Sequence, residues 1–443
     1  MRPSARLLAP CALLALVASA SAETHKVPAD HATIADAVAA AADGDTIIVS
    51  KGTYRESVSV SVPNLELIGK NAVIDAEYAG PCLQLLADGI SVTGFTLVNG
   101  TDGVFGSGAN ISISKCTITS CSDNGIEVEG APVTISKNTV TGCNSDGILY
   151  LHSLPGTGLI EKNVCRLNDE DGIQFTGDDT LLSKNTCEGN EGNGIEISIA
   201  SLSLFGLPLN QPVLIEKNDC RGNEDDGLQV FNDTLSIVRV QANDLTGNCD
   251  HGLDADGNGF LILSNHCDDN RDNGMDLFVG TSVVSGNSAS GNAGDGIALF
   301  VEIFLGDGSP PGSGDGNAVS DNTCKDNAGD GIRLGSGDAN TLDGNTCKDN
   351  LDDGIDVDST AATNTVVDDN TCNDNAHEGL DNGGTGSVLT GNTCKKNGHG
   401  VGPDIAGLGD LGLGTLAIFT DNVFSTGGEA APSRLDDGEA TGP

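Results

Sequence analysis

Three acidic residues recur at one position of a phrase that repeats along this chain: Glu196, Asp254 and Asp276. If successive copies stack as neighbouring rungs of a sheet, the Asp254 and Asp276 carboxylates lie about 5 Å apart, and Glu196 lies about 10 Å from Asp254. A separation of about 5 Å suits a retaining glycosidase, and about 10 Å is near the limit for an inverting one. Stacked like charges also raise one pKa, as an acid catalyst requires. These three are the predicted catalytic residues; the alternative is a chance pairing of aspartates on an acidic surface.

Polar and aromatic residues accompany these carboxylates in equivalent copies of the phrase. Gln174 and Gln229 share the column of the acids, and Phe231, Phe278 and Phe300 stand two residues further along their own copies. Exposed phenylalanine is unexpected in a chain that is 3% aromatic and lacks tryptophan, and sugar rings stack on such faces. We therefore expect these five residues to bind a polysaccharide in an open outward groove at the central coils.

The run Asp254-Ala255-Asp256-Gly257-Asn258-Gly259 resembles the start of a calcium-binding loop. Oxygen ligands stand at alternate positions and glycine stands sixth, as such a loop requires. Its twelfth position is Asn265 rather than glutamate, so a plain Gly/Asp turn is the alternative. The run predicts calcium as a cofactor, held by Asp254, Asp256 and Asn258.

The repeated phrase is about two dozen residues long, a period typical of a solenoid built from stacked units. Its clearest copy is Asn322-Thr323-Cys324-Lys325-Asp326-Asn327, followed by Gly331-Ile332-Arg333-Leu334. Each copy holds short stretches of period-2 alternation separated by Gly, Asn and Asp, which predicts β-strands joined by tight turns. Other copies start at Asn138, Asn163, Asn185, Asn218, Asn243, Asn265, Asn287, Asn345, Asn370 and Asn392. Three strands and three turns make one coil of a parallel β-helix, in which the recurring asparagines stack as ladders.

These repeats resemble the right-handed parallel β-helices of the pectin lyase-like superfamily, in particular its NosD-like repeat group. At the N-terminus the resemblance rests on Ala32–Val38, Gly44–Val49 and Gly52–Tyr54, and overall it covers roughly residues 27–424. It implies an all-β fold, a single right-handed parallel β-helix with a short N-terminal capping helix. Lyases, hydrolases, epimerases, phage tailspikes and inert adhesins share this architecture, so the resemblance leaves the activity open.

The resemblance further implies that residues 32–42 form the helix that closes the open end of the solenoid. Such a plug is physically needed, because an open end would expose unpaired strands. Thr33 or Asp30 is expected to cap this helix, and Gly44 is expected to end it.

Eight cysteines occupy one column of the repeat, two residues after the ladder asparagine. They are Cys165, Cys187, Cys220, Cys267, Cys324, Cys347, Cys372 and Cys394. Leu245 and Ala289 stand in the same column, which marks it as an inward, apolar position. Stacked side chains keep their Cβ atoms near the rung spacing of about 4.8 Å, longer than the ~3.8 Å that a disulfide prefers. We expect a buried ladder of reduced thiols; disulfides, which secretion would favour, are the alternative.

Residues 1–22 are typical of a secretory signal peptide. Arg2 and Arg6 provide a positive start, the apolar stretch after them is too short to span a membrane, and Ala20-Ser21-Ala22 is a small-residue cleavage site. We expect the β-helix domain at residues 23–424 and a disordered tail at 425–443. The protein is expected to be secreted, either periplasmic or extracellular, without a membrane span.

The chain is strongly acidic, with a formal net charge of −43. Such a charge argues against nucleic acid and anionic membranes as partners, and it disfavours polyanionic sugars unless cations bridge the two. A solvated surface suited to a saline habitat is the alternative reading of the acidity. The sequence predicts a carbohydrate-binding or carbohydrate-active protein; the alternative is a non-catalytic extracellular or cell-surface scaffold. It leaves open whether the protein is an enzyme.

Overall fold

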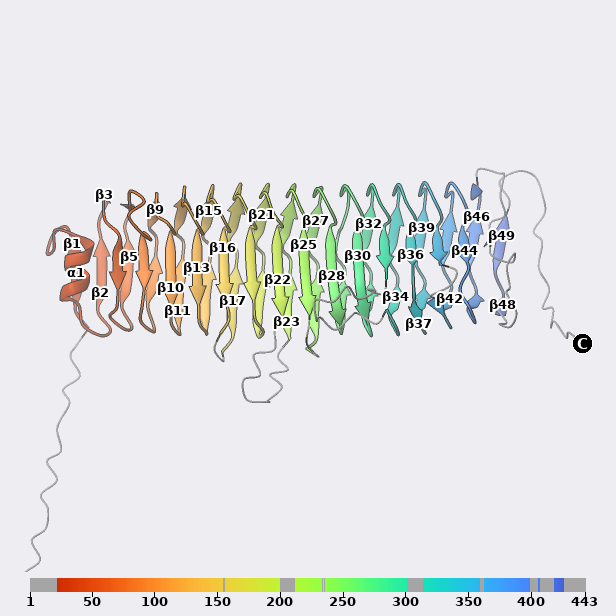
Figure 1. The fold of residues 1–443 in the computed structure, drawn as a ribbon, viewed down its shortest axis with the longest axis horizontal. Helices are drawn as coiled ribbons and strands as arrows, with labels where there is room; N and C mark the ends of the chain where they lie inside the picture. Colours follow the sequence, from red (N-terminus) through yellow and green to blue (C-terminus); the bar gives the residue numbers. More distant parts are fainter. Residues whose placement is uncertain are drawn as a thin grey trace, which may run out of the picture.

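The computed structural model describes residues 22–153, 156–199, 212–232, 234, 236–300, 314–358, 362–398, 405–406 and 418–425. The chain winds into a solenoid in which the strands of each coil stack on those of the coil before (Figure 1). Almost all of the predicted leader and of the predicted tail, residues 1–21 and 426–443, lies outside the described residues. Within them, no helix is long and apolar enough to cross a bilayer. The predicted all-β parallel β-helix is confirmed.

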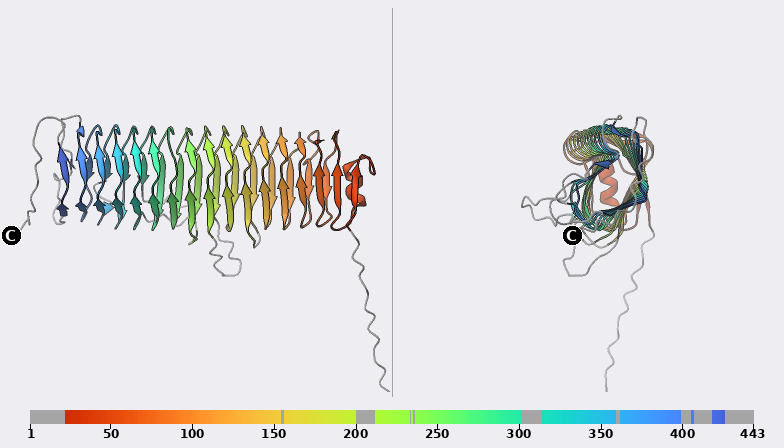
Figure 2. Two further views of the ribbon diagram at one scale, coloured as in Figure 1. Left: turned by 180° about the vertical axis from the view of Figure 1, so that it is seen from behind. Right: turned by 90° about the vertical axis from the view of Figure 1, so that its right-hand side faces the viewer.

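Each coil contributes strands to three parallel sheets, here named A, B and C. Sheet A has 17 strands, sheet C has 15, and sheet B is divided into parts of 9 and 6 strands. One central coil runs from β22 (Ile195–Ile199) in sheet C to β23 (Val213–Glu216) in sheet A and β24 (Asp219–Arg221) in sheet B. Seen along the axis, the three sheets surround one interior (Figure 2). Ile, Val, Leu and Cys side chains fill this interior.

The strands are short, and their bounds recur at nearly constant intervals. Sheet C contains β4 (Val58–Val60), β7 (Leu83–Leu85), β10 (Val104–Ser107), β13 (Ile126–Glu129), β16 (Ile148–Leu151), β19 (Ile173–Thr176), β22, β25 (Leu228–Asn232), β28 (Leu253–Asn258), β30 (Met275–Gly280), β33 (Ile297–Leu299), β36 (Ile332–Leu334), β40 (Ile355–Val357), β44 (Leu380–Asn382) and β47 (Ile405–Ala406). Sheet A contains β1 (Thr24–Val27), β2 (Thr46–Val49), β5 (Glu66–Gly69), β8 (Ser91–Thr93), β11 (Ile111–Ser114), β14 (Val133–Ser136), β17 (Gly158–Glu161), β20 (Thr180–Ser183), β23, β26 (Val238–Gln241), β29 (Phe260–Leu263), β31 (Val283–Ser285), β34 (Ala318–Ser320), β38 (Thr341–Asp343), β42 (Val366–Asp368), β45 (Val388–Thr390) and β48 (Ile418–Thr420).

Sheet B is interrupted between β27 and β32, and a further pair of strands lies outside the three sheets. The first part of sheet B contains β3 (Gly52–Tyr54), β6 (Ala72–Asp75), β9 (Thr96–Val98), β12 (Thr117–Thr119), β15 (Thr139–Thr141), β18 (Val164–Arg166), β21 (Thr186–Glu188), β24 and β27 (Asp244–Thr246). The second part contains β32 (Ser288–Ser290), β35 (Thr323–Lys325), β39 (Thr346–Lys348), β43 (Thr371–Asn373), β46 (Thr393–Lys395) and β49 (Val423–Ser425). The additional pair is β37 (Gly337–Asp338) and β41 (Ala362–Thr363).

Helix α1 (Ile34–Ala40) lies across the N-terminal end of the solenoid (Figures 1 and 2). Thr33 is its N-cap and accepts a hydrogen bond from Asp36 N at 3.0 Å, as predicted. The helix is shorter than the predicted 32–42. It ends because Ala41 is already extended at ψ 151°, so Gly44 follows the helix without capping it. The Glu56 carboxylate, from another coil, accepts the first helical N–H groups, a contact with no local sequence signal.

Two ladders of buried asparagines join successive coils, one on each side of sheet B. In the first, Asn218 Nδ2 donates to Asn243 Oδ1 at 3.0 Å, and Asn218 Oδ1 accepts from Asn185 N and Nδ2 at 3.0 Å. This ladder runs from Asn138 to Asn422. The second runs from Asn168 to Asn397. The predicted stacking of asparagines in turns is confirmed.

The eight cysteines of the predicted column point inward and are fully buried. Cys165, Cys187 and Cys220 are aligned on neighbouring rungs. No disulfide bond joins the described cysteines. Burial raises the pKa of the Cys187 and Cys267 thiols well above the usual value, so both stay neutral and fill the interior as small apolar groups.

Candidate functional site

The outward positions of sheet C form columns in the register that the repeat predicts. The first column aligns Gln174, Glu196, Gln229, Asp254 and Asp276, in that order. Asp254 and Asp276 are therefore direct neighbours, and Gln229 separates Glu196 from Asp254. The column is not the open strip that was expected. Asp276 is only 9% exposed, whereas the other four side chains are half-buried.

Two side chains from the turn between sheets B and C cover Asp276 and account for its burial. His251 Nε2 lies 3.8 Å from Asp276 Oδ2 and 3.5 Å from Asp250 Oδ1. Asn273 Nδ2 donates to Asp276 Oδ1 at 2.9 Å. The repeat pattern places His251 at a turn, and nothing in its local sequence marks it as part of the acid group. Only its position in the folded coil brings it there.

Hydrogen bonds of this turn decide which nitrogen of His251 carries a hydrogen. Turn side chains accept the backbone N–H of the next coil: Asp226 Oδ1 accepts from His251 N at 2.8 Å. In the same way His251 Nδ1 accepts from Asn273 N at 3.2 Å. Because Nδ1 is an acceptor, the neutral ring carries its hydrogen on Nε2.

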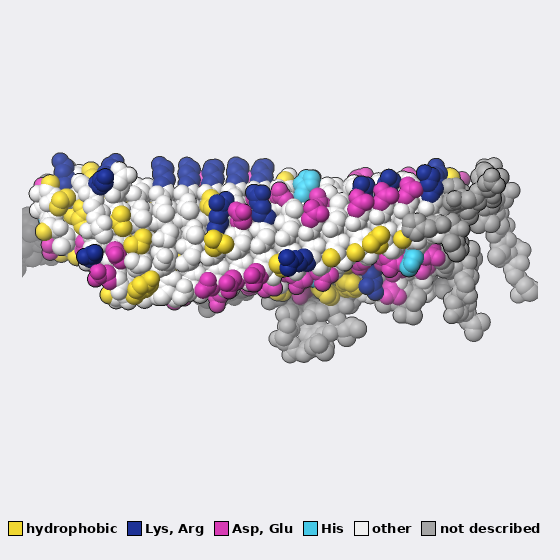
Figure 3. All heavy atoms as spheres, turned by 90° about the horizontal axis from the view of Figure 1, so that it is seen from above, with side chains coloured by type: hydrophobic (Ala, Val, Ile, Leu, Met, Phe, Trp, Pro, Cys, Tyr) yellow, Lys and Arg dark blue, Asp and Glu magenta, His cyan; other side chains and the backbone are white. Residues whose placement is uncertain are grey.

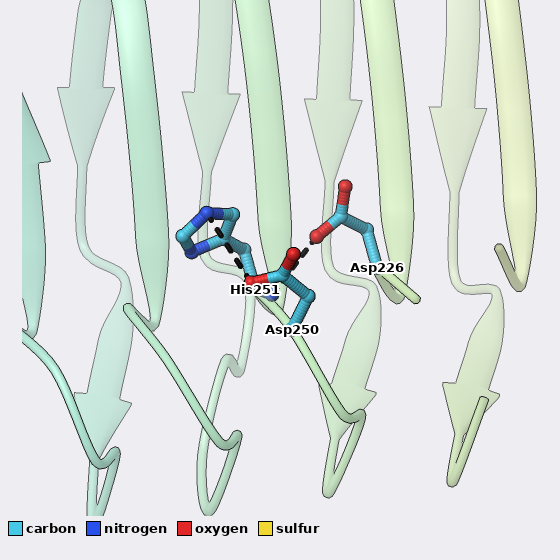
Figure 4. Close-up of side chains that lie close together, drawn as sticks. All are labelled: Asp226, Asp250 and His251. Atoms are coloured by element: carbon cyan, nitrogen blue, oxygen red, sulfur yellow. Dashed lines mark hydrogen bonds and ion pairs between the residues drawn. The ribbon is translucent and has the colours of Figure 1, made fainter. Parts of the chain in front are cut away.

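The three-residue group Asp226, Asp250 and His251 could be read as a metal centre, since its ligand atoms lie within 4.8 Å of one another (Figure 4). The tautomer argues against this, because Nε2 carries a hydrogen and offers no lone pair. His251 instead directs an N–H toward the carboxylates of Asp250 and Asp276.

The two central carboxyls differ in their surroundings. Burial raises the pKa of Asp276 to about 6; His251 opposes this shift and the charge of Asp254 reinforces it. Burial also raises the pKa of Asp254, but Gln229 Nε2 donates to Asp254 Oδ2 at 3.0 Å and stabilises its anion. Asn193 Nδ2 in turn donates to Gln229 Oε1 at 3.3 Å and orients that amide. Asp276 is therefore suited to hold a proton, while the hydrogen bond from Gln229 opposes the effect of burial on Asp254.

The predicted phenylalanines lie along the second outward column, but only two are in contact. Asp256 separates Phe231 from Phe278 in the register. The rings of Phe278 and Phe300 have centroids 5.6 Å apart, and the Arg333 guanidinium lies 5.6 Å from the centroid of the Phe300 ring. All three rings are half-buried. Phe278, on the same strand as Asp276, and Phe300, directly after β33, form an aromatic pair, and Phe231 stands apart.

The run predicted to start a calcium-binding loop forms a strand instead of a loop. Asp254, Asp256 and Asn258 belong to β28, which pairs with β30 along its whole length. Gly257, at φ +121°, continues the strand instead of turning it. The loop geometry that suggested calcium is therefore absent at these residues, and calcium binding by Asp254, Asp256 and Asn258 stays a prediction.

A separate depression of about 380 Å³ lies over sheet B, at its interruption. Its lining residues are Arg221, Asp244, Thr246, His266 and Asp268. None of the predicted site residues lines this depression.

Comparison with known proteins agrees with this architecture. A family model described as "Right handed beta helix region" matches residues 82–234, 210–302 and 309–425. The A-module of the mannuronan C-5 epimerase AlgE6 of Azotobacter vinelandii is a similar solved structure: it is 20% identical with a TM-score of 0.51, and the alignment covers 81% of this chain and 92% of that one. The AlgE4 A-module of the same organism is 17% identical with a TM-score of 0.52, and the alignment covers 74% of this chain and 92% of that one.

At these identities the likeness shows the fold alone. No curated protein matches the chain in sequence. The family model nevertheless spans most of the solenoid, from sheet C strand β7 to the last strand of sheet B. The chain belongs to the right-handed β-helix family.

Proposed function

We propose that this protein is an exported glycoside hydrolase that binds a polysaccharide chain along sheet C. The observation that carries the proposal is that Asp254 and Asp276 are neighbours on adjacent strands in unlike surroundings, with His251 and Asn273 beside Asp276, whose pKa burial raises to about 6. Adjacent strands are about 4.8 Å apart, close to the carboxyl separation of retaining enzymes. The aromatic pair Phe278 and Phe300 supplies a stacking face for a sugar ring beside the acids.

The proposed reaction has two steps. The Asp254 carboxylate attacks the anomeric carbon while Asp276 gives its proton to the glycosidic oxygen, so the C–O bond breaks and the leaving sugar departs as an alcohol. Asp276, now ionised, then takes a proton from water, and that water displaces Asp254 from the anomeric carbon. His251 Nε2–H orients Asp276, and Gln229 holds Asp254 as the nucleophile.

The substrate we propose is a neutral polysaccharide. The strip itself contains Glu196, Asp254 and Asp256, and the chain has a formal net charge of −43, so a polyuronate would be repelled from it. The two similar structures are modules of enzymes named for a polysaccharide, mannuronan, which agrees with a carbohydrate substrate in general. The leader expected at residues 1–22 supports a location outside the cytoplasm.

The test is release of reducing ends from a panel of neutral and acidic polysaccharides. Asp276→Asn should lower kcat by about 100-fold or more, because general acid catalysis typically contributes 10²–10⁴. Asp225→Asn, an exposed aspartate of a nearby coil, should leave the rate unchanged. Binding of a glycan without hydrolysis would replace the enzyme by a lectin-like module. If no polysaccharide of the panel is bound or hydrolysed, the protein is a non-catalytic scaffold instead.

A further inference from the structure

One corner of the solenoid, between sheets A and B, carries a column of left-handed backbone positions. Every coil from Lys115 to Asp421 has a positive φ there, and each member up to Gly391 donates its N–H to the next coil, so the column is continuous. The first five members are Lys115, Lys137, Lys162, Lys184 and Lys217; the next three are Ala242, Ser264 and Gly286; the last five are Asp321, Gly344, Asp369, Gly391 and Asp421. Basic side chains form an evenly spaced row along the upper margin of the N-terminal half (Figure 3).

The backbone does not explain the lysines. Left-handed positions favour Gly, Asn and Asp, which accounts for the glycines and aspartates of the C-terminal half but not for successive lysines in the N-terminal half. Lys162 and Lys217 pair with the preceding Glu161 and Glu216 at 2.7 and 3.2 Å, so the row keeps only part of its positive charge. In a chain of this acidity, a row of exposed lysines indicates a use for positive charge.

The C-terminal half of the same corner is correspondingly acidic. Asp343 directly precedes Gly344 of the column, and Asp368 directly precedes Asp369. Carboxylate oxygens of Asp343, Asp368 and Asp369 lie within 4.8 Å of one another. The corner therefore changes from positive to negative along the axis, with uncharged residues at the centre.

The outer face of sheet A, beside this corner, carries an apolar column. It consists of Leu159, Leu181, Leu214, Leu261, Val283, Ala318, Val366 and Val388, with Arg239 and Thr341 in the same register. The apolar side chains are outward and half-buried. This mainly apolar column, interrupted by the exposed Arg239 and by Thr341, lies beside charged residues and resembles an interface core with a polar rim.

We propose that two copies of this chain associate through sheet A with their axes antiparallel, so that the lysine half of one corner faces the aspartate half of the other. This inference is independent of the proposed hydrolysis, because it uses sheet A and leaves the strip on sheet C free.

The symmetry of the column supports this arrangement. Counted in coils from Ser264, the lysines stand two to six coils before it, and Asp321, Asp369 and Asp421 stand two, four and six coils after it. A two-fold axis at Ser264, across the interface, sets Lys217 opposite the partner's Asp321 and Lys162 opposite the partner's Asp369. Both rows have the rung spacing of the same solenoid, so the charges stay in register along the contact.

Only the antiparallel arrangement brings the two corners together. If two copies met face to face with parallel axes, their corners would fall on opposite sides of the interface and the charges would not meet. The antiparallel pair is isologous and closed, so it predicts a dimer rather than a fibre. The contact along the corner is about 60 Å long. Its width, which spans two outward columns and the corner, is about 13 Å. The buried area is therefore ~800 Å² per partner, as in a standard protein–protein interface.

A row of lysines could also bind a linear polyanion, but the aspartates in the C-terminal half of the corner disfavour this ligand. A polyanion long enough to follow the column would pass from the lysines onto Asp321 and Asp369, where it is repelled. A second copy meets opposite charge in both halves.

The first experiment is sedimentation velocity of the full mature chain in 0.15 M NaCl. We expect a dimer whose dissociation constant rises about ten-fold or more in Lys162→Glu, because the substitution acts at two symmetric places in each dimer. The double variant Lys162→Glu/Asp369→Lys exchanges both members of the pair and should restore the dimer. Lys395→Glu, an exposed lysine on the far side of sheet B, is the matched control and should have no effect.

The second experiment tests the geometry. Ser264→Cys places an exposed thiol on the two-fold axis, so a short bismaleimide should convert the dimer to a covalent one. Ser114→Cys, far from the axis, should not cross-link. A monomer at all concentrations, including one whose lysine row binds a polyanionic glycan, would overturn the proposal. So would a dimer that cross-links through residue 114 but not through 264.

Discussion

At the residue scale, the proposed chemistry depends on the environment of Asp276. Because burial raises its pKa to about 6, the acid form is present below that pH and is lost above it. We predict that kcat/KM falls as the pH rises through about 6, and a pH–rate profile measures this directly.

His251 provides the matched variant. It lowers the pKa of Asp276, so removing the imidazole should move the alkaline limb to higher pH. Two other coils have asparagine at the turn position of His251, namely Asn193 and Asn273, and its side-chain oxygen accepts the backbone N–H of the next coil. The variant His251→Asn keeps such an acceptor and should therefore fold. A limb that stays in place or moves to lower pH would remove His251 from the account.

The register of the acid column could be predicted from the repeat, because Asp254 and Asp276 differ by one period and a parallel ladder aligns equivalent residues. The exposure of Asp276 could not be predicted, since it depends on His251 and Asn273, which reach it from turns. The tautomer of His251 depends on a backbone N–H of the following coil, for which a single repeat gives no signal.

At the element scale, the asparagine ladder should carry much of the cohesion between coils. Asn218→Ala removes its bonds to Asn185 and Asn243 and leaves their buried polar groups without those partners, at a cost of about 3 kcal/mol. We predict a clear fall in the melting temperature, measured by circular dichroism. Asn144→Ala, an exposed turn residue, should change stability by no more than about 0.5 kcal/mol. Equal effects of the two substitutions would mean that the ladder is incidental.

The elements that were predicted incorrectly from the sequence are those in which contacts from other coils override the local sequence signals. Asp254-Ala255-Asp256-Gly257-Asn258 has the composition of a loop, yet pairing with β30 keeps it extended as part of β28. The cap helix ends before Gly44, and its first N–H groups are satisfied by Glu56 from a later coil. The ladder and the inward cysteines could be predicted because each recurs in every period.

At the scale of the whole molecule, buried turn carboxyls should make stability depend on pH. Burial raises the pKa of Asp171, Asp330 and Asp353 to about 8, against about 3.9 in the unfolded chain. Between these values the folded protein holds protons that the unfolded chain has released, so the free energy of unfolding falls as the pH rises. We predict a higher melting temperature at pH 5 than at pH 8.5.

The double variant Asp330→Asn/Asp353→Asn tests the cause. Asparagine stands in this column at Asn193 and Asn273, so the hydrogen bonds between coils are kept while two titrating groups are removed. The dependence of the melting temperature on pH should become shallower. An unchanged slope would place the proton linkage elsewhere.

The most direct measurement of the central claim is a crystal structure of Asp276→Asn with an oligosaccharide that the wild-type protein cleaves. We predict a glycan along sheet C, with the glycosidic oxygen about 3 Å from the side chain of residue 276 and a pyranose ring against Phe278 or Phe300. A glycan bound instead in the depression lined by Arg221 and His266, or on any other face, would contradict it.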